Sequence, residues 1–407
     1  MKSNIDFELF DVSSFISDVE PLKEIVTNCE KIKLVHNISS NLPKLMLTNQ
    51  IRPAIDKLSD ESLLIKFHEL NERELRLLNV QFSFIGHAYI YGGKSPLSKL
   101  PASIAKPWVE ISHKLGRPAV LSYASYCLDN WFKINEDDPI SLSNVALIHN
   151  FLGGIDEDWF VTIHVCIEHA ARGAIKSAVQ ISKLFQEDKV SKKEIYENLN
   201  QLKKSFIEIN HIFRKMPEKC DPYIYYHRVR PYIFGWKNNP DLKNGVIYEG
   251  CFENKPQFYR GETGAQSSIV PTMDALFNVS HEKDELRNYL DEMRGYMPPA
   301  HRQLIEYVEK NSKLKSFIKD DKQLKYDKQL KDDKQLEDLY NESLVEISAF
   351  RAQHLQYAAD YIHKQNTKST LFGSGGSVVR GTGGTPFMKY LKKHKDETDK
   401  TKLDSSK

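Results

Sequence analysis

Long apolar runs are missing from this sequence of 407 residues. No segment approaches the 18 or so consecutive apolar residues that a membrane-spanning helix needs. The N-terminal stretch MKSNIDFELFDVSSF also lacks the apolar core of a signal peptide. We therefore predict a soluble, cytoplasmic protein with no membrane partner.

Cysteine is scarce and dispersed. Its five positions are Cys29, Cys127, Cys166, Cys220 and Cys251. Their number is odd and no two form a C-x-x-C pair, which argues against a disulfide framework and against a zinc ribbon. This usage fits a reducing compartment.

An excess of charge is missing as well. The chain has 57 Lys and Arg against 55 Asp and Glu, a net charge of +2. Such a balance provides no general electrostatic attraction to nucleic acid or to an acidic membrane surface. We expect neither partner, so any ligand has to be recognised by a local site.

Nucleotide-binding loops are absent too. The glycine-rich stretch GSGGSVVRGTGGT lacks the Gly-Lys-Ser/Thr ending of a Walker loop and the G-x-G-x-x-G of a dinucleotide-binding turn. We predict a mobile loop over residues 364–385. Such a loop could close over a site and present backbone N–H groups and Thr382 to an anion.

Helical periodicity is abundant, whereas the alternation typical of strands is rare. The pattern predicts an all-α protein with a small N-terminal helical domain, residues 1–147, and a larger helical domain, residues 148–392. Inside the larger domain a charged hexamer repeats three times over residues 319–336, which predicts a solvated helical or disordered insertion. The polar residues 393–407 are predicted to form a disordered tail.

Two predicted helices each carry a histidine on their apolar face. His354 lies on the apolar stripe of residues 337–363, and His164 on that of residues 158–185. An inward imidazole needs partners for its two nitrogens. The residues alone leave two interpretations open for His354, a satisfied core histidine and a metal ligand.

A zinc site on one helix is excluded for His164, Glu168 and His169. Residues five positions apart are separated by roughly 140° around a regular helix, so these two histidines cannot bind one ion.

A second open question concerns Arg230, which lies in the aromatic stretch PYIYYHRVRPYIFGW. An arginine there needs an anionic partner or a stacking surface, and a partly exposed surface arginine is the alternative.

Six motifs occur in order between residues 118 and 392. They are YASYCLDNW, GWKNNPDLKNGVIYEG, GAQSS, YMPPAHR, FRAQHLQ and GTGGT. Together they resemble the motifs of the indoleamine 2,3-dioxygenase family of haem enzymes. The resemblance implies a larger helical domain that binds haem b, with ferrous iron for activity. It also implies the first step of the kynurenine pathway of tryptophan catabolism, in which O2 opens the pyrrole ring of L-tryptophan to give N-formylkynurenine, and an unidentified reductant as a partner.

The resemblance assigns three residues to the cofactor. His354 in FRAQHLQ matches the proximal ligand of the haem iron, and an inward histidine on a long helix suits that role. Arg351 matches the arginine near a haem propionate. Asp274 is implied as a residue that supports this group.

The resemblance also assigns the substrate site. Arg230 matches the arginine that pairs with the substrate carboxylate, and Thr382 in GTGGT completes that clamp. The remaining matches are pocket-wall positions, where aromatic faces can hold an indole. They are Phe160, Tyr225, Tyr123, Thr263 and Gly264.

Two positions depart from the family pattern. His164 stands where animal members typically have serine, and resembles the distal histidine of the related tryptophan 2,3-dioxygenase family. As the candidate catalytic residue it could accept a hydrogen bond from the indole N–H or contact dioxygen. Tyr225 stands where phenylalanine is usual. Three alternatives stay open: a different indole substrate, a haem protein that binds oxygen reversibly, and a helical scaffold without cofactor.

Overall fold

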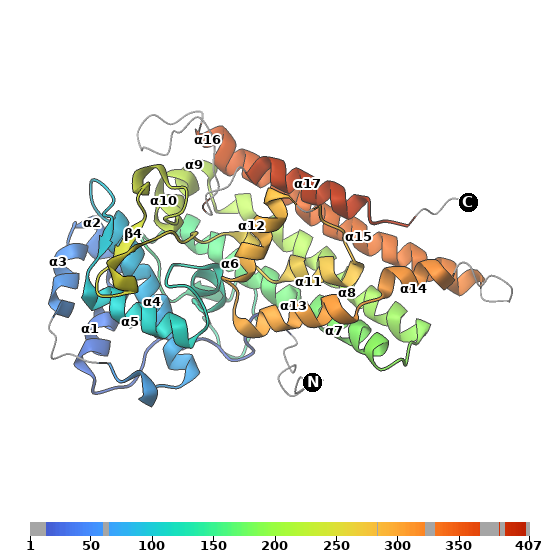
Figure 1. Cartoon of the computed structure of the whole chain (residues 1–407), viewed down its shortest axis with the longest axis horizontal. Coiled ribbons are helices and arrows are strands. Elements are labelled where there is room, and N and C mark those ends of the chain that lie inside the picture. Colours follow the sequence, from blue (N-terminus) through green and yellow to red (C-terminus); the bar gives the residue numbers. More distant parts are fainter. Residues whose placement is uncertain are drawn as a thin grey trace.

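The structure is a computed structural model that describes residues 14–59, 65–282, 284–321, 330–366, 382 and 387–403. Almost all secondary structure in these residues is helical (Figure 1), which confirms the all-α prediction. The α-helices are α1 (Glu30–Ser40), α2 (Leu42–Leu47), α3 (Ile51–Asp56), α4 (Glu72–Tyr91), α5 (Ala102–Lys114), α6 (Ile155–Ala170), α7 (Arg172–Gln186), α8 (Lys192–Phe213), α9 (Pro222–Ile224), α10 (Arg230–Ile233), α11 (Ile269–Phe277), α12 (Glu285–Arg294), α13 (Pro299–Asn311), α14 (Leu314–Asp321), α15 (Leu330–Ala358), α16 (Lys364–Asn366) and α17 (Phe387–Asp399).

The described residues also contain three π-helical turns and five short strands. The π-turns are η4 (Ala124–Leu128), η6 (Tyr225–Val229) and η11 (Ala359–His363), and the strands are β1 (Lys99–Leu100), β2 (Trp131–Lys133), β3 (Val145–Leu147), β4 (Val246–Tyr248) and β5 (Pro256–Gln257). β4 pairs in parallel with β1 and antiparallel with β5, and β2 pairs antiparallel with β3. Because β4 returns to β1, residues of the predicted larger domain pack on the N-terminal part, and the boundary near residue 147 stays a prediction.

Helix α4 is the centre of the N-terminal part, with α1, α3 and α5 packed around it (Figure 1). A capping box starts the helix: the Asn71 side chain accepts from the Glu74 N–H, and the Glu74 side chain accepts from the Asn71 N–H. Most of its residues are buried. His87 on this helix accepts from the Leu121 N–H at 3.0 Å and donates to the Tyr232 carbonyl at 2.7 Å, so α4 is tied to the segments that form the cavity described below.

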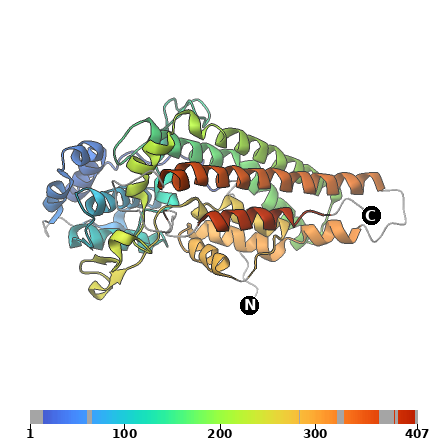
Figure 2. The same ribbon diagram turned by 90° about the horizontal axis from the view of Figure 1, so that it is seen from above.

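The C-terminal part is a bundle in which α15 packs against α8 and α17 (Figures 1 and 2). The apolar stripe of α15, which includes Tyr340, Leu344 and Ile347, is buried as the periodicity predicts. Asn210 on α8 donates to the Glu346 carbonyl on α15 at 3.0 Å. The bundle thereby holds the end of α15 that carries His354 in a defined position.

The prediction of a disordered tail is wrong for residues 393–403. Helix α17 runs back along α15 (Figure 2), and Thr398 and Thr401 near its end are buried. The Leu403 N–H donates to the Asn341 side chain of α15 at 2.8 Å. Polar composition predicts disorder only where the polar groups have no protein partners, and here α15 supplies them.

Two other predicted segments fall partly outside the described residues. In the repeat at 319–336, α14 ends at Asp321 and α15 begins at Leu330, so residues 322–329 lie outside. In the predicted mobile loop 364–385, the described residues are α16 and Thr382. In the part of the chain that the structure describes, no helix has the length and apolarity to span a membrane.

Candidate active site

A cavity of about 580 Å³ lies among α6, α8, α11, α15 and the loop before α11. Its volume lies in the range of pockets that bury a cofactor or a small ligand. It brings together nearly all the predicted site residues, which come from segments far apart in the sequence. These lining residues are Tyr123, Phe160, His164, Tyr225, Thr263, Gly264, Asp274, Arg351, His354 and Thr382.

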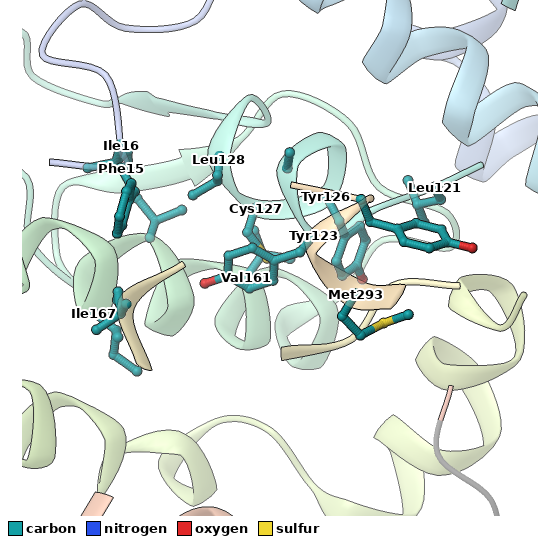
Figure 3. Close-up of a cluster of buried hydrophobic side chains, with 14 of the residues drawn as sticks. Phe15, Ile16, Leu121, Tyr123, Tyr126, Cys127, Leu128, Val161, Ile167 and Met293 are labelled. Carbon is teal, nitrogen blue, oxygen red and sulfur yellow. The ribbon is translucent and has the colours of Figure 1, made fainter. Parts of the chain in front are cut away.

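The three π-helical turns each bring a tyrosine to the cavity. Tyr123 directly precedes η4, Tyr225 opens η6 and Tyr361 lies in η11. A π-turn is wider than an α-turn and is frequent at functional sites. Figure 3 shows Tyr123, together with Tyr126 and Cys127 of η4, in the buried apolar cluster that supports this wall.

His354 is a neutral imidazole with no hydrogen-bond partner among the residues that the structure describes. Burial is the main cause that lowers its pKa to about 4, and no described residue forms a hydrogen bond with either ring nitrogen. The ring lies edge-on to Phe213, with centroids 6.3 Å apart. Among the described residues nothing satisfies this histidine, so its nitrogen lone pair is available to a ligand in the cavity.

Gly264 faces His354 from the loop before α11. A Cβ atom added at Gly264 would lie 3.9 Å from Cε1 of His354. A larger side chain would fill the space beside the imidazole, so glycine keeps that space open.

Arg351 is held one turn before His354 by two helices. Its guanidinium donates to both carboxyl oxygens of Asp274 at 2.6 and 2.7 Å and to the His394 carbonyl of α17 at 2.9 Å. Burial disfavours ionisation of Asp274, but Arg351 and His281 outweigh it and lower the pKa of this carboxyl far below its usual range. Asp274 and Arg351 are therefore a buried ion pair on the cavity wall.

His281 extends this pair to α17 and was missed by the sequence analysis. Its Nε2 lies 3.3 Å from Asp274 and its Nδ1 lies 2.6 Å from Glu397. Burial lowers the pKa of His281, but the two carboxylates outweigh it and raise the value above the usual 6.5. Both nitrogens thus act as donors, and the imidazolium links the two carboxylates.

The side chains of His281, His394 and Glu397 also lie close enough to suggest a metal site. One ligand atom from each lies within 4.8 Å of the others. A metal needs a free nitrogen lone pair, and both nitrogens of His281 already face carboxylates. The group is therefore better described as part of the ion-pair network around Arg351.

His164 is oriented by its own helix. Its Nδ1 lies 2.7 Å from the carbonyl oxygen of Phe160, one turn earlier in α6. A carbonyl only accepts, so Nδ1 carries the proton, and burial lowers the pKa and keeps the ring neutral. Nε2 is then a lone-pair acceptor on a ring that lines the cavity.

Aromatic rings form the cavity wall next to His164. The Phe160 ring lies 4.5 Å from that of His164 and 4.8 Å from that of Tyr225 between centroids. The Tyr123 ring lies edge-on to His164 at 5.9 Å. The wall offers apolar faces beside one hydrogen-bond acceptor.

Arg230 lies next to the cavity but is not among the residues that line it. It is 4% exposed, and its guanidinium lies 5.1 Å from the ring centroids of both Tyr226 and Phe234.

Thr382, in contrast, lines the cavity. Its hydroxyl donates to the Glu262 carbonyl, and its own carbonyl accepts from the Gly235 N–H at 3.3 Å.

Two buried glutamates near the cavity were not predicted as residues of this site; Glu168 had been considered only for a zinc site, which was excluded. Glu168 lies behind the wall, where it accepts from Tyr123 at 2.9 Å and from Ser267 at 2.8 Å, and burial raises its pKa to about 7. Glu262 lies on the wall itself. In the sequence both look like ordinary polar residues, one on a helix and one in a loop, and only their packing marks them.

The GAQSS motif fixes the loop that carries Glu262. The Gln266 side chain accepts from the Tyr123 N–H at 2.8 Å and donates to the Gly261 carbonyl at 2.9 Å. Ser267 donates to Glu168, as described above. The polar residues of this motif therefore join the loop to the opposite wall of the cavity.

The apolar cavity and a neutral histidine that no described residue hydrogen-bonds fit a haem group. His354 would hold its iron, and Arg351, fixed by Asp274, would meet an anionic group of the cofactor.

Comparison with known proteins agrees with the assignment of a haem site. The model of the family described as indoleamine 2,3-dioxygenase matches residues 3–401. The chain is 32% identical to indoleamine 2,3-dioxygenase 1 of Rattus norvegicus, over 90% of this chain and 88% of the relative. It is 28% identical to indoleamine 2,3-dioxygenase of Saccharomyces cerevisiae, over 94% and 90% respectively. It is 26% identical to indoleamine 2,3-dioxygenase nanC of Aspergillus nanangensis, over 97% and 96%.

These matches confirm the resemblance and extend it over the N-terminal helices, which carry none of the six motifs. The chain belongs to the indoleamine 2,3-dioxygenase family and is a haem-dependent dioxygenase.

Proposed function

We propose that this protein opens the pyrrole ring of L-tryptophan with O2 to give N-formylkynurenine, with haem b held by His354. The observation that carries the proposal is the pair of neutral histidines on one cavity. His354 has no described protein partner, and His164 presents an acceptor nitrogen. When bound, the ferrous haem would supply the activation of dioxygen.

His164 orients the indole in this proposal. An indole N–H is a donor only, and Nε2 of His164 is an acceptor, so the two are complementary. The same nitrogen would offer dioxygen a lone pair and no hydrogen. This favours contact with the indole over contact with dioxygen, and it argues against reversible oxygen binding as the main function.

The aromatic wall and the charged groups position the rest of the substrate. Phe160 and Tyr225 provide flat faces against which an indole can pack. Arg230, next to Tyr225, would pair with the substrate carboxylate, with Thr382 as the second member of the clamp. A substrate held in this way reacts from one orientation, which supplies part of the rate.

Arg351 would serve the cofactor rather than the substrate. Its bonds to Asp274 and to the His394 carbonyl restrict the guanidinium before any ligand arrives. A preorganised arginine can pair with a carboxylate of the cofactor at a smaller loss of side-chain entropy.

The test is product formation by the purified, reduced protein. L-Tryptophan is added in air while the haem spectrum and the formation of N-formylkynurenine are followed. A chemical reductant takes the place of the physiological reductant, which is unidentified. Catalytic formation of the product is the expected result. A stable oxygenated spectrum without product would overturn the proposal in favour of oxygen binding, and a protein without haem would overturn the cofactor assignment.

A different indole is the second candidate substrate. The Tyr225 hydroxyl and the Glu262 carboxyl both face the cavity, and neither has a hydrogen-bond partner among the described residues. Polar groups of this kind could recognise a substituted indole. A panel of indoles in the same assay separates the two candidates by their kcat/KM values.

A further inference from the structure

Glu262 is a buried acid that has no part in the proposed binding of L-tryptophan by His164, Arg230 and Thr382. It is 2% exposed and lines the cavity. Its carboxyl group has no hydrogen-bond or ion-pair partner among the described residues, and burial alone raises its pKa to about 8. A buried ionisable group without a partner is costly for a fold, and a ligand group in the cavity would offset that cost.

The backbone holds Glu262 at this position. Its N–H donates to the Ile233 carbonyl at 3.1 Å, and its carbonyl accepts from the Thr382 hydroxyl. The two chain segments touch at Gly261 and Gly235, because a Cβ atom added at Gly261 would lie 2.4 Å from the Gly235 nitrogen. The side chain therefore cannot reach solvent by a small movement of the loop.

Glu262 and Arg230 both lie near the Tyr225 hydroxyl. Burial raises the pKa of Tyr225, Glu262 raises it further, and Arg230 lowers it. Each group is thus near enough to act on the same hydroxyl. The head group of an α-amino acid carries the same two charges in complementary order, a carboxylate for the arginine and an ammonium for the glutamate.

We infer that Glu262 binds the α-ammonium group of the substrate and so selects zwitterionic indoles over indole acids. The inference rests on the proposed function, because it requires an amino-acid substrate in this cavity. On binding, Glu262 releases its proton to solvent and the ammonium keeps its own. Glu262 would thus bind the ammonium group of the amino acid, and Arg230 would bind its carboxylate.

The experiment compares three ligands on the haem-loaded protein, kept oxidised so that no turnover occurs. L-Tryptophan carries both charged groups, indole-3-propionate lacks the ammonium, and tryptamine lacks the carboxylate. Dissociation constants are measured by calorimetry for the wild type, Glu262→Gln and Glu168→Gln. Glu168 is the matched control, because it is an equally buried acid that already has two partners and does not line the cavity.

Glu262→Gln is expected to weaken binding of L-tryptophan and of tryptamine by about tenfold to a hundredfold. It should leave the affinity for indole-3-propionate within about twofold. In Glu168→Gln the ratio of affinities for L-tryptophan and indole-3-propionate is expected to match that of the wild type.

Equal effects of Glu262→Gln on L-tryptophan and indole-3-propionate, or no effect on either, would overturn the role of Glu262 while the proposed function stands. A wild type that binds none of the three ligands would contradict the proposed function itself. The substitution removes a costly buried acid, so the variant is expected to fold.

Discussion

The Nδ1 atom of His164 donates a hydrogen bond to the carbonyl oxygen of Phe160 at 2.7 Å. The two residues are one turn apart on α6, so this bond needs no other part of the chain. It determines which nitrogen of the ring keeps its lone pair. The helix that brings His164 to the cavity thereby also makes it an acceptor.

Removal of that acceptor should lower kcat/KM most for substrates that have an indole N–H. We expect His164→Ala to lower kcat/KM for L-tryptophan about tenfold more than it lowers kcat/KM for 1-methyltryptophan. The methylated substrate has no indole N–H to donate. Steady-state kinetics with both substrates measure the ratio. His169→Ala, on the same helix but not on the cavity wall, is the control. Equal losses for the two substrates would contradict the acceptor role.

Substitution of the axial ligand should affect the cofactor first. His354→Ala is expected to lose most of its bound haem, because the substitution removes the imidazole that would hold the iron. The ratio of Soret to protein absorbance after purification measures this. His363→Ala, an exposed histidine at the end of the same helical segment, should keep its haem. A normal ferrous spectrum in His354→Ala would refute the ligand assignment.

Arg230 should matter for the substrate and not for the cofactor. Arg230→Ala is expected to weaken L-tryptophan binding by about tenfold to a hundredfold with unchanged haem content, since a charge-assisted hydrogen bond is lost. Arg230→Lys should recover part of the affinity, because lysine keeps the charge and loses the fork geometry. Arg228→Ala is the matched control, two positions away and exposed. Loss of haem from Arg230→Ala would contradict the assignment.

The Asp274–Arg351 pair should contribute to stability. Asp274→Asn leaves the buried Arg351 without its anion and is expected to lower the free energy of unfolding by about 3 kcal/mol. Asp291→Asn, which breaks the exposed Arg287–Asp291 pair, should cost less than about 1 kcal/mol. Denaturant unfolding measures both.

The same pair predicts a pH dependence with two limits. The pKa of Asp274 is lowered in the folded state, so its contribution is present above the unfolded value of about 3.9 and is lost as the pH falls further. The pKa of His281 is raised, so its contribution is present below about 6.5 and is lost as the pH rises through the folded value. The difference between wild type and Asp274→Asn should be largest between these limits. A difference that does not change with pH would rule out the ion-pair network.

Glu262 should make the protein less stable as the pH rises. Its folded pKa is about 8, so the unfolded chain ionises from about pH 4 while the folded chain holds its proton. The stability of the wild type relative to Glu262→Gln should therefore fall by about 2–4 kcal/mol between pH 5 and pH 8. Thermal unfolding at several pH values measures this in the absence of substrate. If the stability of the two proteins depended on pH in the same way, Glu262 would have to be ionised or paired in the folded state.

Part of the site could be predicted from the sequence because it depends on local order. The 3.6-residue period places His354 on the same helical face as Tyr340, Leu344 and Ile347, whatever packs against that face. The same reasoning holds for His164 and Phe160 on α6. The motifs then identified the family, which the comparisons confirm.

Other residues could not be predicted because their environment is built from distant segments. Glu262 is polar and lies in a glycine-containing loop, a context that usually means exposure to solvent. Its burial depends on the contact of residues 233–235 with residues 260–262 and on Thr382, 120 positions later in the chain. The proton that His281 holds depends on Asp274 and Glu397, which come from different helices.

The sequence by itself determined the helical class, the inward faces of the two histidine-bearing helices and the family, because periodicity and short motifs are properties of neighbouring residues. Only the tertiary structure decided that residues 393–403 pack on α15 and that Arg230 lies next to the cavity wall. It also decided that Glu262 lies on this wall with no side-chain partner among the described residues. Burial of a polar group and its protonation depend on which distant segments exclude water from it, and this is set by packing rather than by local pattern.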